Sequence, residues 1–290
     1  MAKSLLLSTR RPRGLQTAMY SAIWAYPWDF QDEGYDLVSD RVAAAGLNGV
    51  SVASAYHNIR ALCPHNPKRA VYHGEDGVLY FHPEPSHFIG HVIQPVLSDL
   101  CDKEDPLEQI CKSAHKAGVK VHAWTVLHHN TRLGTTYPKC TVQNAFGDRY
   151  PFGLCPSNPD VRAYTIGLVR SLSERSEIDT IELESLGFMG MEHSGHHAKA
   201  GMELGPVHRF LLSLCLCDSC TSKMETHGVD VERARNAIVN ELRAGFSGRF
   251  GGTAPDEMVA FEDILGADQA EGILAAREES VLSLLEEIYW

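Results

Sequence analysis

The feature that most constrains the fold is a repeated alternation of short apolar segments with longer amphipathic ones. Four segments have the composition and length of strands and lie at 17–26, 47–58, 119–130 and 178–184. Each of the first three is followed, directly or after a loop, by a segment with helical spacing of apolar residues. The helix expected at 105–118 has Pro106 in its first turn and Gly118 at its end. Strands that alternate with helices in this way predict a parallel sheet.

The lengths of the connections narrow the fold class further. Long segments follow strands, whereas the turns from helix back to strand are short. In a (β/α) barrel the loops at the carboxyl ends of the strands form the active site. A doubly wound sheet also binds ligands there, but neither a G-x-G-x-x-G motif after the first strand nor a P-loop is present, which disfavours nucleotide binding. We therefore expect an α/β protein with a parallel TIM-type barrel, of which only the first half, about four to five β/α units, is present.

This pattern predicts one barrel-type domain over residues 1–290, incomplete at its C-terminal end. Two long segments after strands stand out: 59–94, rich in Pro and His, and 185–229, rich in His and Cys. Segments of this length in a compact domain are usually functional loops or lids. Two further helices are expected at about 230–244 and 267–289.

Charge and composition exclude some partners. The chain has 37 acidic and 26 basic residues, a formal net charge of -11, and no clustered basic face is evident, so nucleic-acid binding is not expected. No apolar run approaches the ~18 residues of a membrane helix. The N-terminal segment is too weakly apolar for a signal peptide, so we expect a cytoplasmic protein whose eight cysteines are reduced.

Two acidic residues at the end of the fourth strand are the first candidates for chemistry. Glu182 and Glu184 alternate with Ile181 and Leu183, so both carboxylates point to the same face, the expected barrel interior. Glu184 lies nearer the mouth, where burial can tune a carboxylate for general-acid catalysis. Glu182 lies deeper and needs hydrogen bonds or a cationic partner. Alternatively, both belong to a buried ion-pair network.

The third strand supplies a second row of candidates. His122, Trp124 and His128 share one parity, and His129 and Asn130 follow at the strand mouth. His57 ends the second strand in the same way. An aromatic platform beside acidic groups suits sugar rings, so these six residues are candidates for substrate binding. The alternatives are that Trp124 fills the core and that the histidines are structural, although an imidazole titrates near neutral pH and suits catalysis.

The segment after the fourth strand contains Glu192, His193, His196 and His197. These residue types could form a substrate subsite or bind a divalent transition metal. Their spacing matches neither H-E-x-x-H nor another zinc motif, so we expect Glu192 and His193 to bind substrate.

Three cysteines form a C-x-C-x-x-C motif: Cys215, Cys217 and Cys220. Thiols at this spacing suggest a structural zinc site, but such a site needs a fourth ligand. Cys140 or Cys155 could supply it through the fold, and free thiols are the alternative. No cofactor is required for the expected chemistry.

Four stretches carry a resemblance to a known family. They read HAWTVLHHN, NAFGDRYPFGLCPSNPDVRAY, IDTIELESLGFMG and LLSLCLCDSC. They resemble the uncharacterised glycoside-hydrolase-like TIM-barrel proteins, over roughly residues 18–220. Related retaining glycosidases have their acid/base at the end of strand four and their nucleophile on strand seven. The resemblance therefore implies that Glu184 is the acid/base, and no residue here matches the nucleophile, because no seventh strand is found.

Three functions follow from these residues. The first is a glycoside hydrolase that cleaves O-glycosidic bonds, with Glu184 as general acid/base and Glu182 beside it. The second is a metal-dependent lyase, isomerase or hydrolase that uses the His-rich mouth. The third is a non-catalytic sugar-binding protein with a degenerate barrel. In the first and third cases the expected partner is a small carbohydrate.

The incomplete barrel also predicts contact with another chain. Four strands leave an uncovered sheet edge, which is a liability in a folded protein. The last helix presents an apolar stripe of Ile273, Val281, Leu284, Leu285 and Ile288. We expect a second copy to cover these surfaces, giving a homodimer.

Overall fold

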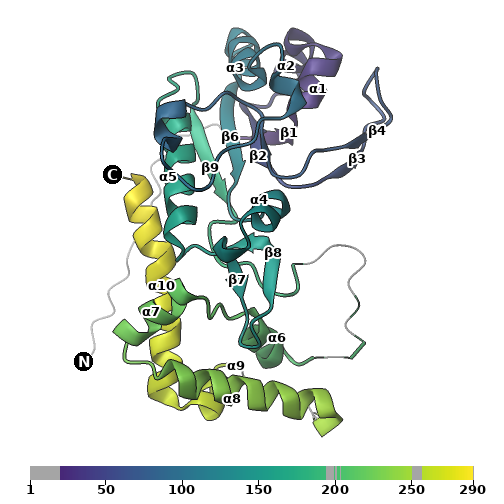
Figure 1. Ribbon diagram of the computed structural model, residues 1–290. Helices are drawn as coiled ribbons and strands as arrows, with labels where there is room; N and C mark the ends of the chain where they lie inside the picture. Colours follow the sequence, from purple (N-terminus) through teal and green to yellow (C-terminus); the bar gives the residue numbers. More distant parts are fainter. Residues whose placement is uncertain (1–19, 194–198, 200, 203, 250–256, 290) are drawn as a thin grey trace, which may run out of the picture.

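The computed structural model describes residues 20–193, 199, 201–202, 204–249 and 257–289, and a parallel sheet lies in its upper half in Figure 1. The strands β1 (Ala22–Ala25), β2 (Gly49–Tyr56), β6 (Lys120–Val126) and β9 (Thr180–Glu184) lie in the order β1-β2-β6-β9. All three neighbouring pairs are parallel. The predicted parallel sheet is therefore confirmed, with its strands in sequence order.

Shorter strands and helices surround this sheet. Strand β5 (Val78–Leu79) pairs antiparallel with the end of β2, and two hairpins are formed by β3 (Arg60–Leu62) with β4 (Val71–His73) and by β7 (Thr141–Gln143) with β8 (Arg149–Leu154). The α-helices are α1 (Pro27–Glu33), α2 (Tyr35–Ala44), α3 (Pro106–Lys116), α4 (Thr131–Thr136), α5 (Pro159–Ser173), α6 (Pro206–Ser213), α7 (Asp218–Thr226), α8 (Val231–Ala244), α9 (Glu257–Leu265) and α10 (Ala267–Tyr289). Short 3₁₀ turns are η1 (Pro85–Phe88), η2 (Asp99–Cys101) and η3 (Pro138–Cys140), and α8 ends in a π-turn, η4 (Gly245–Arg249).

Local sequence signals fix the helix ends. Asp105 accepts a hydrogen bond from the backbone N–H of Glu108 at the start of α3, and Pro106 occupies the first helical position. Asn158 caps α5 in the same way, since its Oδ1 accepts from two backbone N–H groups of the first turn. Such caps satisfy donors that have no partner within the helix. After α3 the chain turns back through Gly118 at φ +75°, a conformation in which glycine carries no steric cost.

The two faces of the sheet differ in composition. The outer face carries aliphatic residues such as Val50, Val52 and Val121, which pack against Leu107 and Ile110 of α3 in the first hydrophobic core. The inner face carries serine, histidine, tryptophan and glutamate. Because side chains alternate along a strand, one row of residues builds the core and the other is free to form a site.

The sheet does not close into a barrel within the described residues. Its outermost strands, β1 and β9, each pair with one neighbour only. The structure thus has the topology expected for the first four strands of a (β/α) barrel, and closure stays a prediction. None of the described helices combines the length and the apolar character needed to cross a membrane.

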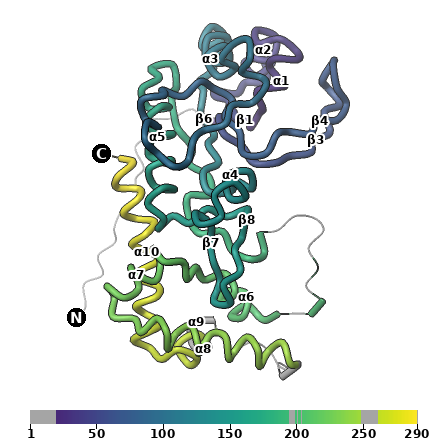
Figure 2. The backbone as a smooth tube through the Cα atoms, in the orientation of Figure 1, coloured from purple at the N-terminus to yellow at the C-terminus, as the bar shows by residue number. Residues whose placement is uncertain are grey.

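The remaining helices form a second hydrophobic core with the β7–β8 hairpin. Figure 2 shows α6–α9 at one end of the molecule and α10, which returns from them to lie beside α5. In this core Ile273 is 1% exposed. Leu284, further along α10, is fully buried. The prediction that another chain covers the whole apolar stripe of α10 was therefore wrong for these two residues, because the chain's own elements bury them.

Candidate functional site

An open groove of about 510 Å³ lies on the inner face of the sheet. Trp24 and Tyr26 line it from β1 and the residue after it, Trp124 lines it from β6, and Glu182 and Glu184 line it from β9. The structure therefore brings together three residues expected from the sequence and adds Trp24 and Tyr26. The alternation of aromatic residues along the first strand was the available signal for these two.

Glu184 is held by a neighbouring indole. Trp124 Nε1 donates a hydrogen bond to Glu184 Oε2 at 2.5 Å. The next residue, Ser185, has φ +57° and is the only non-glycine residue of the described chain with positive φ. Its carbonyl accepts a hydrogen bond from the backbone N–H of His128. Such backbone outliers are energetically costly and concentrate at functional sites. The backbone conformation at the end of β9 is therefore typical of a functional site.

Aromatic rings form the wall beside Glu184. The Trp24 side chain is exposed, and its ring centre lies 6.2 Å from that of Trp124. Tyr26 and Tyr56 lie 5.8 and 4.9 Å from Trp124, with Tyr56 edge-on. Burial raises the pKa of the Tyr56 hydroxyl, which keeps it protonated as a hydrogen-bond donor. Trp24 therefore offers a water-exposed face, while the rings behind it hold Trp124 in place.

The carboxylate of Glu182 accepts hydrogen bonds from protein side chains. Its Oε1 accepts hydrogen bonds from Ser51 Oγ at 2.7 Å and from His122 Nδ1 at 2.8 Å. If Nδ1 donates to the carboxylate, Nε2 accepts from the Tyr20 hydroxyl, 2.6 Å away. A side chain at Gly49 would clash with this arrangement, because a Cβ there would lie 2.1 Å from the Tyr20 oxygen. Tyr20, His122 and Glu182 therefore form a connected polar chain on the floor of the sheet.

Three predicted histidines meet at the mouth of the strands. His57 and His129 have ring centres 4.0 Å apart, and His129 and His193 have theirs 4.3 Å apart. His193 Nε2 and His129 Nδ1 are 3.1 Å apart, a hydrogen bond. Burial, together with the neighbouring imidazoles, lowers the pKa of His129 to about 4, and burial also lowers the pKa of His57. The neutral form of the imidazole is therefore favoured at His57 and His129.

Three other predicted site residues lie outside the groove. His128 is fully buried and its Nε2 lies 3.1 Å from Thr165 Oγ1 of α5. The shared parity with His122 fails because β6 ends at Val126 and the chain turns. Asn130 caps α4. Glu192 is exposed and pairs with Arg209 at 3.3 Å. His196 and His197 lie outside the described residues.

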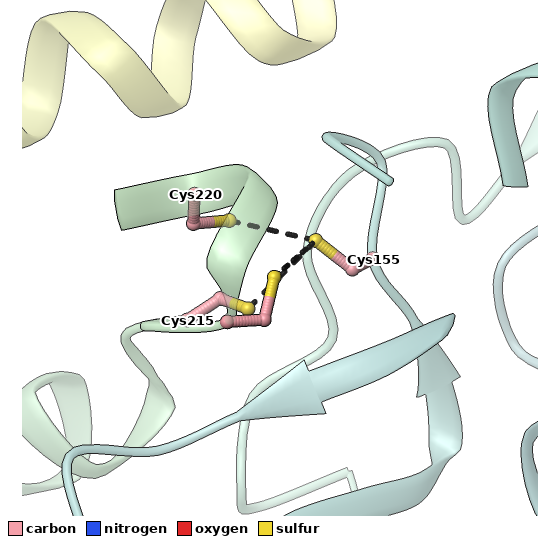
Figure 3. A group of neighbouring side chains, drawn as sticks. Cys155, Cys215 and Cys220 are labelled. Carbon is pink, nitrogen blue, oxygen red and sulfur yellow. Dashed lines mark hydrogen bonds between the residues drawn. The ribbon is translucent and has the colours of Figure 1, made fainter. Parts of the chain in front are cut away.

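A second cluster joins the β7–β8 hairpin to α7. Cys155 Sγ lies 3.5 Å from Cys220 Sγ and 3.7 Å from the sulfurs of both Cys215 and Cys217 (Figure 3). All four thiols are buried and could hold a metal ion. A tetrahedral zinc with Zn–S bonds of ~2.3 Å places its sulfurs ~3.8 Å apart, close to these separations. Cys155 is therefore the fourth member, whereas Cys140 packs in the first core.

The polar environment of the cysteine cluster favours anionic sulfur at one of its four positions. Hydrogen bonds with the other three thiols, together with burial, raise the pKa of Cys155. Hydrogen bonds lower the pKa of Cys217, so this sulfur acts as the acceptor. The backbone N–H of Gln143 also donates to Cys215 Sγ at 3.4 Å. Arg277 of α10 lies over the Phe188 ring at 4.4 Å and interacts electrostatically with three of the thiols.

The described residues contain one set with metal-binding geometry. Among them, only the four cysteines form a group of three or more His, Cys, Asp or Glu whose ligand atoms all lie within 4.8 Å. The histidine row is more extended, so it does not present a compact ligand set.

Comparisons with known proteins indicate the fold only. No family model matches the chain, and no curated protein matches it in sequence. Among solved structures, it is similar to α-L-fucosidase isoenzyme 2 from Paenibacillus thiaminolyticus, with 12% identity, a TM-score of 0.51, and coverage of 93% of this chain and 30% of the fucosidase. A β-galactosidase from Marinomonas ef1 gives 12% identity, coverage of 93% and 35%, and a TM-score of 0.46. The chain thus spans about a third of each enzyme, and its α/β architecture is shared with part of the fucosidase.

Proposed function

We propose that this chain is a glycoside hydrolase in which Glu184 is the general acid/base. The proposal is supported above all by one observation: the Glu184 carboxylate lies in an open groove beside the exposed ring of Trp24 and accepts a hydrogen bond from Trp124. The apolar face of a sugar ring can stack on an indole while its hydroxyls bind acidic groups. A carboxyl group next to such a ring is within reach of a glycosidic oxygen.

The chemistry needs a proton donor and a second carboxylate. Glu184 protonates the leaving oxygen, and two carboxylates across the scissile bond stand ~5–9.5 Å apart in glycosidases. Glu182 lies two residues earlier on the same strand, which separates the two backbones by ~6–7 Å along the strand axis. This stacking does not flank a bond. Glu182, bound by Ser51 and His122, therefore orients the polar floor of the groove rather than attacking the sugar.

Glu184→Gln tests the proposal. The amide keeps the shape of the side chain but cannot transfer a proton, so turnover of glycosides with poor leaving groups should fall ~10²–10⁴-fold. Aryl glycosides with good leaving groups should be affected less. Glu192→Gln is the matched control, because Glu192 is exposed and pairs with Arg209 outside the groove. Equal rates for Glu184→Gln and wild type on the poor leaving group would contradict the acid role.

A non-catalytic sugar-binding protein is the second candidate. It is favoured by the composition of the groove, because the acidic residues that line it in the described part of the chain, Glu182 and Glu184, lie on one strand. Titration calorimetry with oligosaccharides separates the two functions. Binding that is lost in Trp24→Ala, without turnover of any glycoside, supports the binding protein.

We also infer that the four cysteines hold a structural zinc ion. The donor set fits, since structural zinc sites are closed and tetrahedral and are often formed by four thiolates. Elemental analysis should find about one zinc per chain, lost in Cys155→Ser. Cys140→Ser is the control, because Cys140 is equally buried but lies in the first core. Zinc that persists in Cys155→Ser, or is absent from the wild-type chain, contradicts this assignment.

A further inference from the structure

The two edges of the central sheet are complementary. Strands β1 and β9 both run parallel to their neighbours, and in the described residues neither has a partner on its outer side. Unpaired backbone groups on a strand edge are a template for pairing with another strand. A parallel strand placed beside β1 would continue the sheet, and β9 of a second copy has the required direction and a similar length.

The flanks beside these edges carry exposed apolar side chains. Ile23 on β1 points away from the groove and is 48% exposed, and Leu37 on α2 is 47% exposed. At the other flank α10 lies beside α5 (Figure 1) and exposes Leu282, Leu285 and Tyr289. In a (β/α) barrel the outer face of every strand is covered by a ring of helices. Among the described residues, Ile23 on the outer face of β1 is left half exposed, and α10 has an apolar side that could cover it.

We propose that two copies of this chain associate about a two-fold axis and close an eight-stranded barrel. In this arrangement β1 of each copy pairs with β9 of its partner, and α10 of each copy packs on Ile23 of the other. A two-fold axis makes both contacts equivalent, so the assembly ends at two copies. Closure removes both sheet edges at once, and the four strands of each copy supply half of the eight that a barrel of this type contains.

Closure would also complete the groove, and this part of the inference rests on the proposed function. Eight strands spaced ~4.8 Å apart and tilted by ~36° form a cylinder ~15 Å across. Glu184 and the partner's Glu184 would extend towards the axis from opposite walls. If each side chain reaches ~4 Å inwards, the carboxylates stand ~7 Å apart, within the range for the two carboxylates of a glycosidase. The second copy would thus supply a carboxylate opposite Glu184, which the described residues of one chain do not place there.

Light scattering on the full chain tests the association without any substrate. At micromolar concentration the wild type should have twice the chain mass of 32.0 kDa. Ile23→Lys and Leu285→Lys introduce a charge at the two flanks and should each raise the dimer dissociation constant at least tenfold. Leu62→Lys is the matched control, since Leu62 is 76% exposed on the β3–β4 hairpin. Circular dichroism melts of all three variants serve as the control that they fold.

The outcomes separate the two proposals. A wild-type monomer with a cooperative melt, or a dimer that withstands both edge variants, overturns the association. In a dimeric enzyme, specific activity should fall on dilution in step with the dimer mass. Specific activity that does not change on dilution contradicts the proposal that the two copies form one active site together. A dimer disrupted by both edge variants but inactive on every glycoside supports the association and counts against the proposed function.

Discussion

Protonation of His128 should make the folded state unstable in mild acid. The imidazole is fully buried between β6 and α5, and burial lowers its pKa to about 4 from the ordinary value of 6.5. Thr165 donates its own hydroxyl proton to the Val161 carbonyl, so Nε2–H of His128 donates to Thr165 Oγ1. The ring is thus held neutral, and the backbone of Leu186 and Gly187 offsets only part of the burial effect.

The sign and size of this effect on stability follow from the different pKa values of His128 in the folded and unfolded chain. Between pH 6.5 and pH 4 the unfolded chain binds a proton at this histidine that the folded chain does not, so stability falls as pH falls. A difference of ~2.5 pKa units corresponds to about 3 kcal/mol below pH 4, and to about 2 kcal/mol at pH 5. Above pH 6.5 the imidazole is neutral in both states and the effect vanishes.

Urea unfolding of His128→Gln at pH 7.5 and pH 5 measures how much protonation of His128 lowers the free energy of unfolding. At pH 7.5 the variant should be less stable than wild type, by ~1–3 kcal/mol, because packing and a buried hydrogen bond change. At pH 5 that deficit should shrink by about 2 kcal/mol, since the variant has no imidazole to protonate. His73→Gln, at an exposed position on β4, should show the same small change at both pH values. An equal deficit for His128→Gln at both pH values would show that the buried imidazole does not cause the loss of stability in acid.

Three further changes have expected outcomes. Leu284→Ala should lower the free energy of unfolding by ~2–5 kcal/mol, whereas Leu62→Ala, at an exposed position on β3, should change it by less than ~0.5 kcal/mol; both are measured by urea unfolding. Gly49→Ala should displace Tyr20, which tyrosine fluorescence or a crystal structure would reveal. Trp124→Phe keeps an aromatic ring but loses the donor to Glu184, so kcat should fall more than KM rises.

Much of the fold could be predicted because local signals and long-range structure agree. The Pro–cap combination at Asn158 and the Gly118 stop specify helix ends from neighbouring residues alone, and the structure has both. Alternation along β9 likewise placed Glu182 and Glu184 on one face, and both line the groove. These inferences depend on a periodicity that holds as long as the strand continues.

Inference failed where the periodicity ended or where distant segments meet. His128 lies two residues beyond the end of β6, so its parity carried no information. The sequence could not favour Cys155 over Cys140 as the fourth thiol. Cys155 and Cys215 are 60 residues apart in the sequence, and only the folded hairpin brings them together. The burial of Ile273 also depends on helices that contribute to the core from elsewhere in the sequence.

The return of α10 to α5 has a consequence for synthesis on the ribosome. Ile273 completes the second core, and Ile288 packs against the first. The second core therefore needs the first turns of α10 to have left the exit tunnel, and the first core needs the last turns, although the four strands emerge much earlier. During that interval the nascent chain exposes apolar surface from both cores, so folding intermediates are prone to aggregate. We expect the yield of folded protein to depend on chaperones that shield nascent chains.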